Sequence, residues 1–360
     1  MAKVSLRAYN REIEAMTDRG QLDEAIAHCL HILTIFPKHL ETYRLLGKAY
    51  LEYKRYKDAV DIFSRVLVVE PNDFVANVGL SIIRDEEDKL DDAIWHMERA
   101  FEVQSANPAI QSELQRLYGR REGVQPPRIR MTRGALAHMY MQGELYPQAI
   151  SEVKSVLSDD AGRTDMQVLM ARAYFKSGQK NEAADTASAV LRRYPYCLDA
   201  NRILVEILGS ERSDNSQLYR QRVIELDPYA AQVSGSIYES NEVGDAAVTL
   251  EHFEWDGKTT SGQSDWDSSQ AISLDSGRAT RGPEVQPDWL TNGGFADSTP
   301  PQATPKVVPP LPTAPTFDFP ASIPAASEPE PAQPTAEADI PDFLREAGWG
   351  ESTGTFDESK

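Results

Sequence analysis

Residues 40–73 read LETYRLLGKAYLEYKRYKDAVDIFSRVLVVEPND, and this stretch decides the fold. Apolar and small side chains recur three or four residues apart in two separate runs, which is the spacing of amphipathic helices. Pro71 follows the second run, because proline cannot continue a helix. The stretch predicts two antiparallel helices, with Gly47 and Ala59 small enough for close approach. The runs are Tyr43, Leu46, Gly47, Tyr50 and then Tyr56, Ala59, Phe63, Leu67.

The same pattern recurs along the chain with a regular period of about 34 residues. Ala59 has counterparts one period away at Ala25 and Ala93, and Ala149 and Ala183 repeat the spacing. The step from Ala93 to Ala149 exceeds one period by the length of the segment 108–129, which predicts an insertion there. The predicted units are 6–39, 40–73, 74–107, 130–163, 164–197 and a shortened unit at 198–229.

These residues resemble the tetratricopeptide repeat family. The resemblance covers residues 6–229 and implies an all-α solenoid of five to six helix-turn-helix repeats, in which the first helix of each pair lines a concave face. Family members that bind chaperone C-termini place an asparagine where Leu45 stands here, so chaperone binding is not implied. When the repeats are aligned, the groove positions hold basic residues able to bind carboxylates: Arg44, Lys48, Arg172, Lys176 and Arg202.

The insertion at 108–129 carries its own helix signals. Asn107 is suited to cap a helix that begins at Pro108, and Gly123 is suited to end it. The apolar stripe of this helix is Ile110, Leu114 and Leu117. We therefore expect an extra helix that covers one junction between repeats.

Arginines cluster in and after this insertion and form the one basic patch of the chain. They are Arg116, Arg120, Arg121, Arg128, Arg130 and Arg133. One interpretation is a solvated, charged loop. A second is a site for an acidic protein segment, the chain's own tail included. The third is a nucleic-acid site, which the lack of interleaved aromatic residues disfavours.

The sequence contains no recognisable catalytic motif. Cys29 and Cys197 are too few for a disulfide scaffold and fit a reducing compartment. His28 and His31 share a helix face, but no carboxylate or second cysteine supports a metal site there. The acidic run 85–88 lacks the spacing of a calcium loop and is interpreted as a solvated turn. We expect a chain that is not an enzyme and has no metal and no cofactor.

Charge and hydropathy limit the partners and the location. The formal net charge is −19, which makes the chain a poor general binder of nucleic acid or anionic lipid. The first seven residues, MAKVSLR, include no apolar leader, and no apolar run approaches the roughly 18 residues that a membrane span needs. We expect a soluble cytoplasmic protein.

Residues 258–360 differ in composition from the repeats. Fifteen of the 23 prolines lie after residue 250, and residues 251–360 hold 19 acidic and 6 basic side chains. Such a segment cannot bury enough apolar surface to fold alone, so we predict a long disordered tail. Residues 230–257 are interpreted as a capping or transition segment, with a short helix within 243–253.

Two segments of the tail, at 287–290 and 340–349, share the form Pro-Asp-aromatic-Leu. The second fits a two-turn amphipathic helix whose apolar side chains would be costly to expose. We interpret both as docking motifs, with key residues Asp288, Trp289, Leu290, Asp342, Phe343, Leu344 and Trp349. The arrangement is similar to bacterial tetratricopeptide repeat proteins with acidic tails of this kind, which implies no activity.

The preferred function is a non-catalytic scaffold or adaptor for protein–protein interactions. Its groove would bind peptide segments, and its tail motifs would dock in cis or in trans. The alternative is a regulatory or accessory subunit of a separate enzyme. Nucleic-acid binding through the arginine-rich insertion is a third and less favoured hypothesis.

Overall fold

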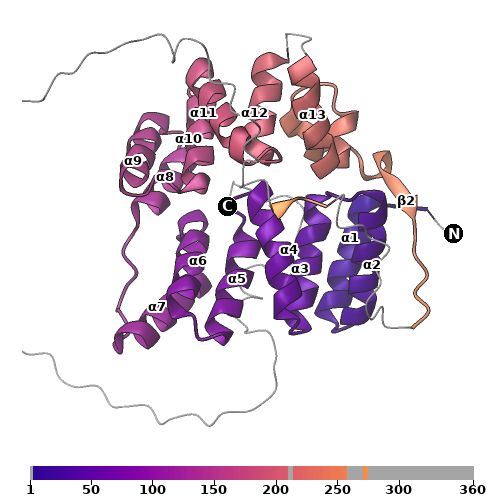
Figure 1. Cartoon of the computed structure of the whole chain (residues 1–360), viewed down its shortest axis with the longest axis horizontal. Coiled ribbons are helices and arrows are strands. Elements are labelled where there is room, and N and C mark those ends of the chain that lie inside the picture. Colours follow the sequence, from indigo (N-terminus) through magenta and orange to yellow (C-terminus); the bar gives the residue numbers. More distant parts are fainter. Residues whose placement is uncertain (1–2, 210–213, 258–270, 275–360) are drawn as a thin grey trace, which may run out of the picture. The chain divides into compact units, whose positions relative to one another are not determined.

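The computed structural model describes residues 3–209, 214–257 and 271–274, and the docking motifs predicted at 287–290 and 340–349 lie outside these residues. Helices dominate the described residues (Figure 1). The α-helices are α1 Leu6–Asp18, α2 Leu22–Ile35, α3 Leu40–Glu52, α4 Tyr56–Val69, α5 Phe74–Glu86, α6 Leu90–Val103, α7 Pro108–Glu122, α8 Arg133–Gln142, α9 Tyr146–Asp159, α10 Thr164–Lys176, α11 Lys180–Arg193, α12 Leu198–Leu208 and α13 Asp214–Leu226.

Apart from α7, these helices form successive hairpins, which confirms the predicted all-α solenoid. Successive first helices touch one another, since α1 contacts α3 and α3 contacts α5. Each hairpin turn from α1–α2 to α10–α11 holds one residue in the left-handed backbone conformation, and these residues recur at the repeat period on each side of α7. Glycine occupies two of these turns, and side chains that pay a steric cost occupy the others. The turn residues are Gly20, Lys54, Asp88, Glu144 and Gly178.

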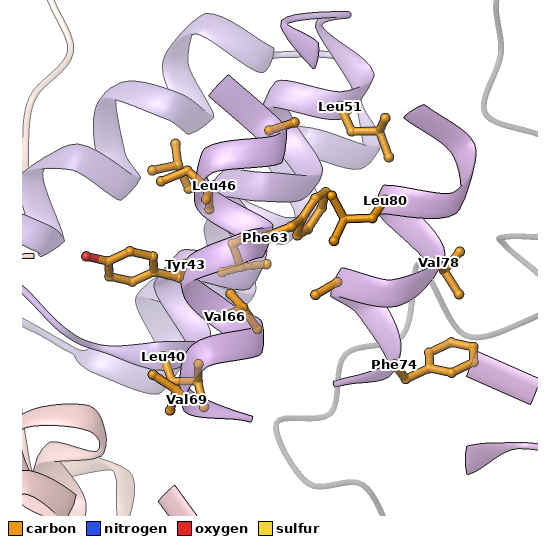
Figure 2. Packing of buried hydrophobic residues seen from close by; sticks show 14 of the residues in the cluster. Leu40, Tyr43, Leu46, Leu51, Phe63, Val66, Val69, Phe74, Val78 and Leu80 are labelled. Carbon is orange, nitrogen blue, oxygen red and sulfur yellow. The ribbon is translucent and has the colours of Figure 1, made fainter. Parts of the chain in front are cut away.

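Phe63 is the centre of the packing between the second and third hairpins. Its ring is fully buried and lies between Leu46 of α3 and Leu80 of α5 (Figure 2). A Cβ atom added to Gly47 would lie 2.5 Å from this ring, and one added to Gly79 would lie 2.4 Å from it. The sequence predicted that Gly47 lets two helices approach. In the structure, the space it leaves is filled by the Phe63 ring.

Helix α7 begins where a fourth hairpin would begin. Leu6, Leu40, Phe74 and Pro108 start α1, α3, α5 and α7, and each follows the one before it by exactly one repeat period. The Asn107 side chain accepts hydrogen bonds from two backbone N–H groups of the first turn, and Gly123 ends the helix with a φ of 76°. No second helix follows in register, because residues 124–132 form an irregular connection to α8. The insertion is thus a first helix without its partner.

The hydrophobic core crosses the junction that follows α7 through Ala135 of α8. One buried cluster runs through α1–α7 and includes this alanine and residues of α12 and α13, and smaller clusters serve α8–α10 and α10–α12. A buried polar network bridges this junction. Glu102 of α6 accepts hydrogen bonds from Arg163 at 2.5 Å, from Arg99 at 3.1 Å and from the Thr132 hydroxyl at 2.9 Å. Arg163 also pairs with Asp165 of α10 at 2.6 Å, so buried charged contacts add to the apolar packing at this junction.

After α13 the chain passes through short 3-10 helices at η1 Pro228–Gln232, η2 Ile237–Glu242 and η3 Asp245–Ala247. Strand β2 (Thr249–Glu251) then pairs antiparallel with β1 (Lys3–Ser5). The short helix expected within 243–253 is reduced to the three-residue 3-10 helix η3, and β2 follows it. The β-branched Val248 and Thr249 favour a strand, and only Leu250 within β2 is buried, the alternation that an edge pairing produces.

Candidate functional site

The predicted groove arginines are paired with acidic residues of the chain itself. Arg44 reaches Glu41 at 2.8 Å and both Glu70 and Asp73 at 2.5 Å. Burial acts to lower the pKa of Arg44, but these carboxylates together raise it well above the ordinary value. The Asp73 side chain also caps α5 by accepting the Ala76 N–H at 2.7 Å. Arg44 therefore joins α3 to the start of α5, and little of its charge is left for a partner.

The other groove positions differ in how far they are occupied. Lys48 pairs with Asp18 at 3.0 Å, Arg172 with Asp199 at 3.5 Å and Arg202 with Asp227 at 3.7 Å. Lys176 is exposed and makes no ion pair with another described residue. Of the five predicted groove residues, Lys176 has the charge most open to a ligand.

Two arginines of the insertion patch, Arg116 and Arg120, pair with the acidic run 85–88 that we interpreted as a solvated turn. Arg116 pairs with Asp85 at 2.6 Å and with Glu113, while Arg120 pairs with Asp85 and with Asp88 at 3.1 Å. The patch and the turn are therefore one surface of opposite charges. Of the remaining members, Arg121 pairs with Glu122 and Arg133 pairs with Glu152. Arg128 and Arg130 are exposed and form no ion pair within the described part of the chain.

Part of the groove side of the first helices is occupied by the chain's own residues 228–243. Tyr238 stacks on Phe175 of α10, with ring centroids 6.1 Å apart, and the Arg202 guanidinium lies 5.8 Å from the Tyr238 ring. Just after Tyr238, the same segment meets α1. Arg7 donates to the backbone carbonyls of Ser240 at 2.7 Å and Val243 at 2.5 Å.

From Glu251 at the end of β2 onward, the chain crosses the first hairpin and is held through its backbone. The Phe253 N–H donates to the Tyr9 hydroxyl at 3.0 Å, and the His31 Nε2 lies 3.0 Å from the Glu251 carbonyl oxygen. The Phe253 ring also stacks on the His31 ring, with centroids 5.3 Å apart.

Residues 271–274 repeat this arrangement on the second hairpin. The Ile272 N–H donates to the Tyr43 hydroxyl at 3.4 Å, and Arg65 donates to the Ile272 carbonyl at 2.5 Å. Tyr43 follows Tyr9 by one repeat period, and Arg65 follows His31 by one period as well. Each of these two hairpins thus presents a tyrosine acceptor and a basic donor to a backbone segment. We call these the backbone-holding pairs.

The neutral form of His28 supports the first backbone-holding pair, Tyr9 with His31. The Tyr9 hydroxyl accepts the Phe253 N–H and lies 2.6 Å from His28 Nδ1, so with Nδ1 unprotonated it donates its own proton to that nitrogen. This requires neutral His28. Burial, together with nearby His252, lowers the pKa of His28 to about 4, and burial raises the pKa of Tyr9 to about 12.

Neither cysteine has the environment of a reactive thiol. Cys29 and Cys197 are buried, and burial raises the pKa of both, that of Cys197 to about 12. No three His, Cys, Asp or Glu side chains converge on a metal-sized site among the residues described. In the same residues, no helix is long and apolar enough to cross a bilayer.

Sequence reasoning missed the backbone-holding pairs. It assigned Tyr43 to the hairpin core and His31 to an ordinary helix surface. A usable signal was present, since Tyr9 with Tyr43 and His31 with Arg65 occupy equivalent positions of successive repeats. The segments they hold gave no such signal, because Phe253 lies 244 positions from Tyr9 and Ile272 lies 229 positions from Tyr43.

Comparison with known proteins supports the tetratricopeptide repeat family. Residues 16–77 and 165–195 match sequence models described as tetratricopeptide repeat. No curated protein matches the chain. The matched stretches lie within α1–α5 and α10–α11 of the helical solenoid.

Solved structures with detectable similarity include Pseudomonas aeruginosa pilF, at 14% identity and a TM-score of 0.26, covering 65% of this chain and 95% of that one. The P58(IPK) TPR domain has 12% identity and a TM-score of 0.30, and the match covers 66% of this chain and 65% of that one. Naa15/Naa10 bound to HypK-THB has 18% identity and a TM-score of 0.25, and the match covers 64% of this chain and 37% of that one. The chain thus spans less than two thirds of the length of the P58(IPK) and Naa15/Naa10 chains that it matches.

Proposed function

We propose that this chain is a non-catalytic scaffold for protein–protein interactions, whose repeats hold polypeptide segments and whose tail presents docking motifs. Tetratricopeptide repeats generally mediate such interactions, and their fold is typically non-catalytic. The observation that carries the proposal is the pair of backbone-holding sites. Recognition through backbone N–H and C=O groups makes few demands on side chains, so the same chemistry suits segments from other proteins.

The charges of the solenoid also favour a protein partner over nucleic acid. Most arginines of the insertion are matched by carboxylates, so few are left to displace counterions from phosphates. Exposed Lys176, Arg128 and Arg130 suit single acidic side chains of a peptide. The tail motifs around Trp289 and Phe343 supply apolar anchors of the kind that fill a groove.

Affinity purification with the full-length chain tests the proposal. The decisive variant carries alanine at Asp288, Trp289, Leu290, Phe343 and Leu344, and a control variant carries alanine at Asp297, Val307 and Val308 in the same tail. We expect the wild type and the control to retain a reproducible set of proteins, and the motif variant to lose part of it. Retention of the same background by all three and by an empty support would contradict the proposal, as would turnover of a small molecule by the pure chain.

The same experiment distinguishes the scaffold proposal from the alternative, an accessory subunit of a separate enzyme. A scaffold retains several proteins at varying ratios. A subunit of a separate enzyme retains that enzyme alone, at a fixed ratio to the chain.

A further inference from the structure

The two backbone-holding pairs differ in what keeps their segments in place. At the first pair, Phe253 follows directly from β2, which is itself paired with β1, and the Phe253 ring stacks on His31. At the second pair, Tyr43 and Arg65 hold the backbone of Ile272 at its N–H and at its carbonyl. Residues 271–274 make no strand pairing within the described part of the chain. The second segment therefore lacks the pairing that fixes the first.

A single side chain anchors this second segment. Ile272 is fully buried and belongs to the main hydrophobic cluster, and Ala271 beside it is buried as well. Leu274, two positions further on, is 41% exposed. Hydrogen bonds to the backbone give affinity for an extended segment, and a pocket for one side chain gives specificity. The site thus takes one branched aliphatic side chain that follows a small residue.

The groups that hold the backbone are oriented by the solenoid itself. The Arg65 Nε and Nη2 bind Asp61 at 2.8 and 3.3 Å, and its Nη1 donates to the Ile272 carbonyl at 2.5 Å. The Tyr43 hydroxyl donates to the Pro37 carbonyl at 2.9 Å and accepts the Ile272 N–H. Because both groups have fixing partners within the first two hairpins, another segment would find them already in place.

The basic donors of both pairs belong to second helices. Arg65 lies on α4, and its equivalent His31 lies on α2. The predicted groove residues lie on first helices, Arg44 on α3 and Lys176 on α10. Residues 228–243 already occupy part of that groove side. The solenoid therefore has a place for an extended segment outside the predicted groove.

We propose that the second backbone-holding pair is an exchangeable peptide-binding site, which residues 271–274 fill in cis and a partner protein fills with an extended segment of the form small–branched aliphatic–small. This inference rests on the scaffold proposal and deepens it by naming the place that binds and the chemistry of what it binds. The chain's own segment competes as a tethered ligand, with an effective concentration on the order of millimolar. The affinity for a partner segment is therefore reduced by the fraction of chains whose site is open.

Opening the site in the full-length chain tests the proposal. Ile272→Asp puts a charge at the buried anchor, and Leu274→Asp puts the same charge at an exposed position as the matched control. The probe is a fluorescein-labelled peptide of residues 268–277, SSQAISLDSG. Fluorescence polarisation should show that Ile272→Asp binds this peptide at least about tenfold more tightly than the wild type or Leu274→Asp does. Equal affinities of the three chains would overturn the proposal.

Changes in the peptide check the chemistry and the place. Ile272→Val in the peptide should keep its binding to the opened chain, whereas Ile272→Asp or Ala271→Trp in the peptide should abolish it. When benzoylphenylalanine replaces the leucine of the peptide, irradiation should link the peptide to α2 or α4. A link to first helices only would place the peptide in the groove and overturn the proposal.

The wild type gives a readout that does not depend on the folding of a variant. Excess peptide should quicken amide hydrogen exchange at Ile272 and leave the Phe253 amide unchanged, and no change at Ile272 would count against an exchangeable site. A wild-type dimer that Ile272→Asp dissociates would also overturn the proposal, since it would assign the site to a second copy of the chain. None of these outcomes depends on proteins captured through the tail, so they are distinguishable from failure of the scaffold function.

Discussion

Tyr9 and Tyr43 are one repeat period apart, and the hydroxyl of each accepts a backbone N–H from the C-terminal part of the chain. Phe253 donates to the first and Ile272 to the second. The internal repeat of the sequence has therefore produced a repeated interaction as well as a repeated fold. Each tyrosine also donates within its own hairpin, Tyr9 to His28 and Tyr43 to the Pro37 carbonyl.

Removal of one hydroxyl should release one segment and leave the other in place. Tyr9→Phe takes away the acceptor for Phe253 and the donor to His28, which should lower the free energy of unfolding by about 1–3 kcal/mol. Amide hydrogen exchange should quicken at Phe253 and stay unchanged at Ile272. Tyr43→Phe serves as the matched control and should give the reverse. Equal responses of both amides to either variant would show that the two sites are not independent.

Gly47 should not tolerate a side chain. The Cβ of Gly47→Ala would lie 2.5 Å from Phe63 Cε1 in a fully packed core, and relief of this overlap should cost about 1–3 kcal/mol. Urea denaturation measures this cost. Gly244→Ala is the control, because a Cβ there meets nothing within 4 Å, and it should change stability by less than about 0.5 kcal/mol. Adding Phe63→Leu to Gly47→Ala should reduce the loss of stability that the alanine causes. An undiminished loss would show that the alanine does not clash with Phe63.

Acid should destabilise the solenoid through His28. The pKa of His28 is lowered from 6.5 to about 4, so between these pH values the unfolded chain binds the proton and the folded chain does not. The free energy of unfolding should therefore decrease as pH falls from about 6.5 towards 4, by about 1–3 kcal/mol from this residue. Thermal unfolding against pH measures it.

His28→Gln should flatten this pH dependence in part, because a glutamine can accept the Tyr9 proton without titrating. His39, His96 and His138, whose pKa values burial also lowers to about 4, contribute to the slope that remains. If the stability of the wild type and of His28→Gln depended on pH in the same way, His28 would not be a source of the acid sensitivity.

Glu102 should be necessary for the junction between α6 and α8. Glu102→Ala leaves the buried guanidinium groups of Arg99 and Arg163 short of an acceptor, which should cost about 3–5 kcal/mol. Because repeats couple mainly to their neighbours, urea unfolding should separate into two steps. Glu152→Gln removes a carboxylate that pairs with exposed Arg133, and should cost no more than about 1 kcal/mol in a single transition. A single transition for Glu102→Ala would contradict this role for Glu102.

The sequence alone predicted the repeat unit and its register. Tyr43, Gly47, Ala59 and Phe63 lie within one repeat unit, and their spacing reflects helices whose hydrogen bonds are local. The start of α7 at Pro108 was also readable, since Asn107 and Pro108 are adjacent signals. The candidate site was predictable only as positions on first helices, because charge type is visible in a sequence and charge pairing is not.

Tertiary structure decided which of those charges are available and what the solenoid surface holds. Arg44 meets Asp73, and Arg116 meets Asp85, only because neighbouring hairpins stack. The contact of Tyr9 with Phe253 joins residues 244 positions apart. No local periodicity encodes such a contact, because the geometry that brings the two ends together is the accumulated result of every hairpin between them.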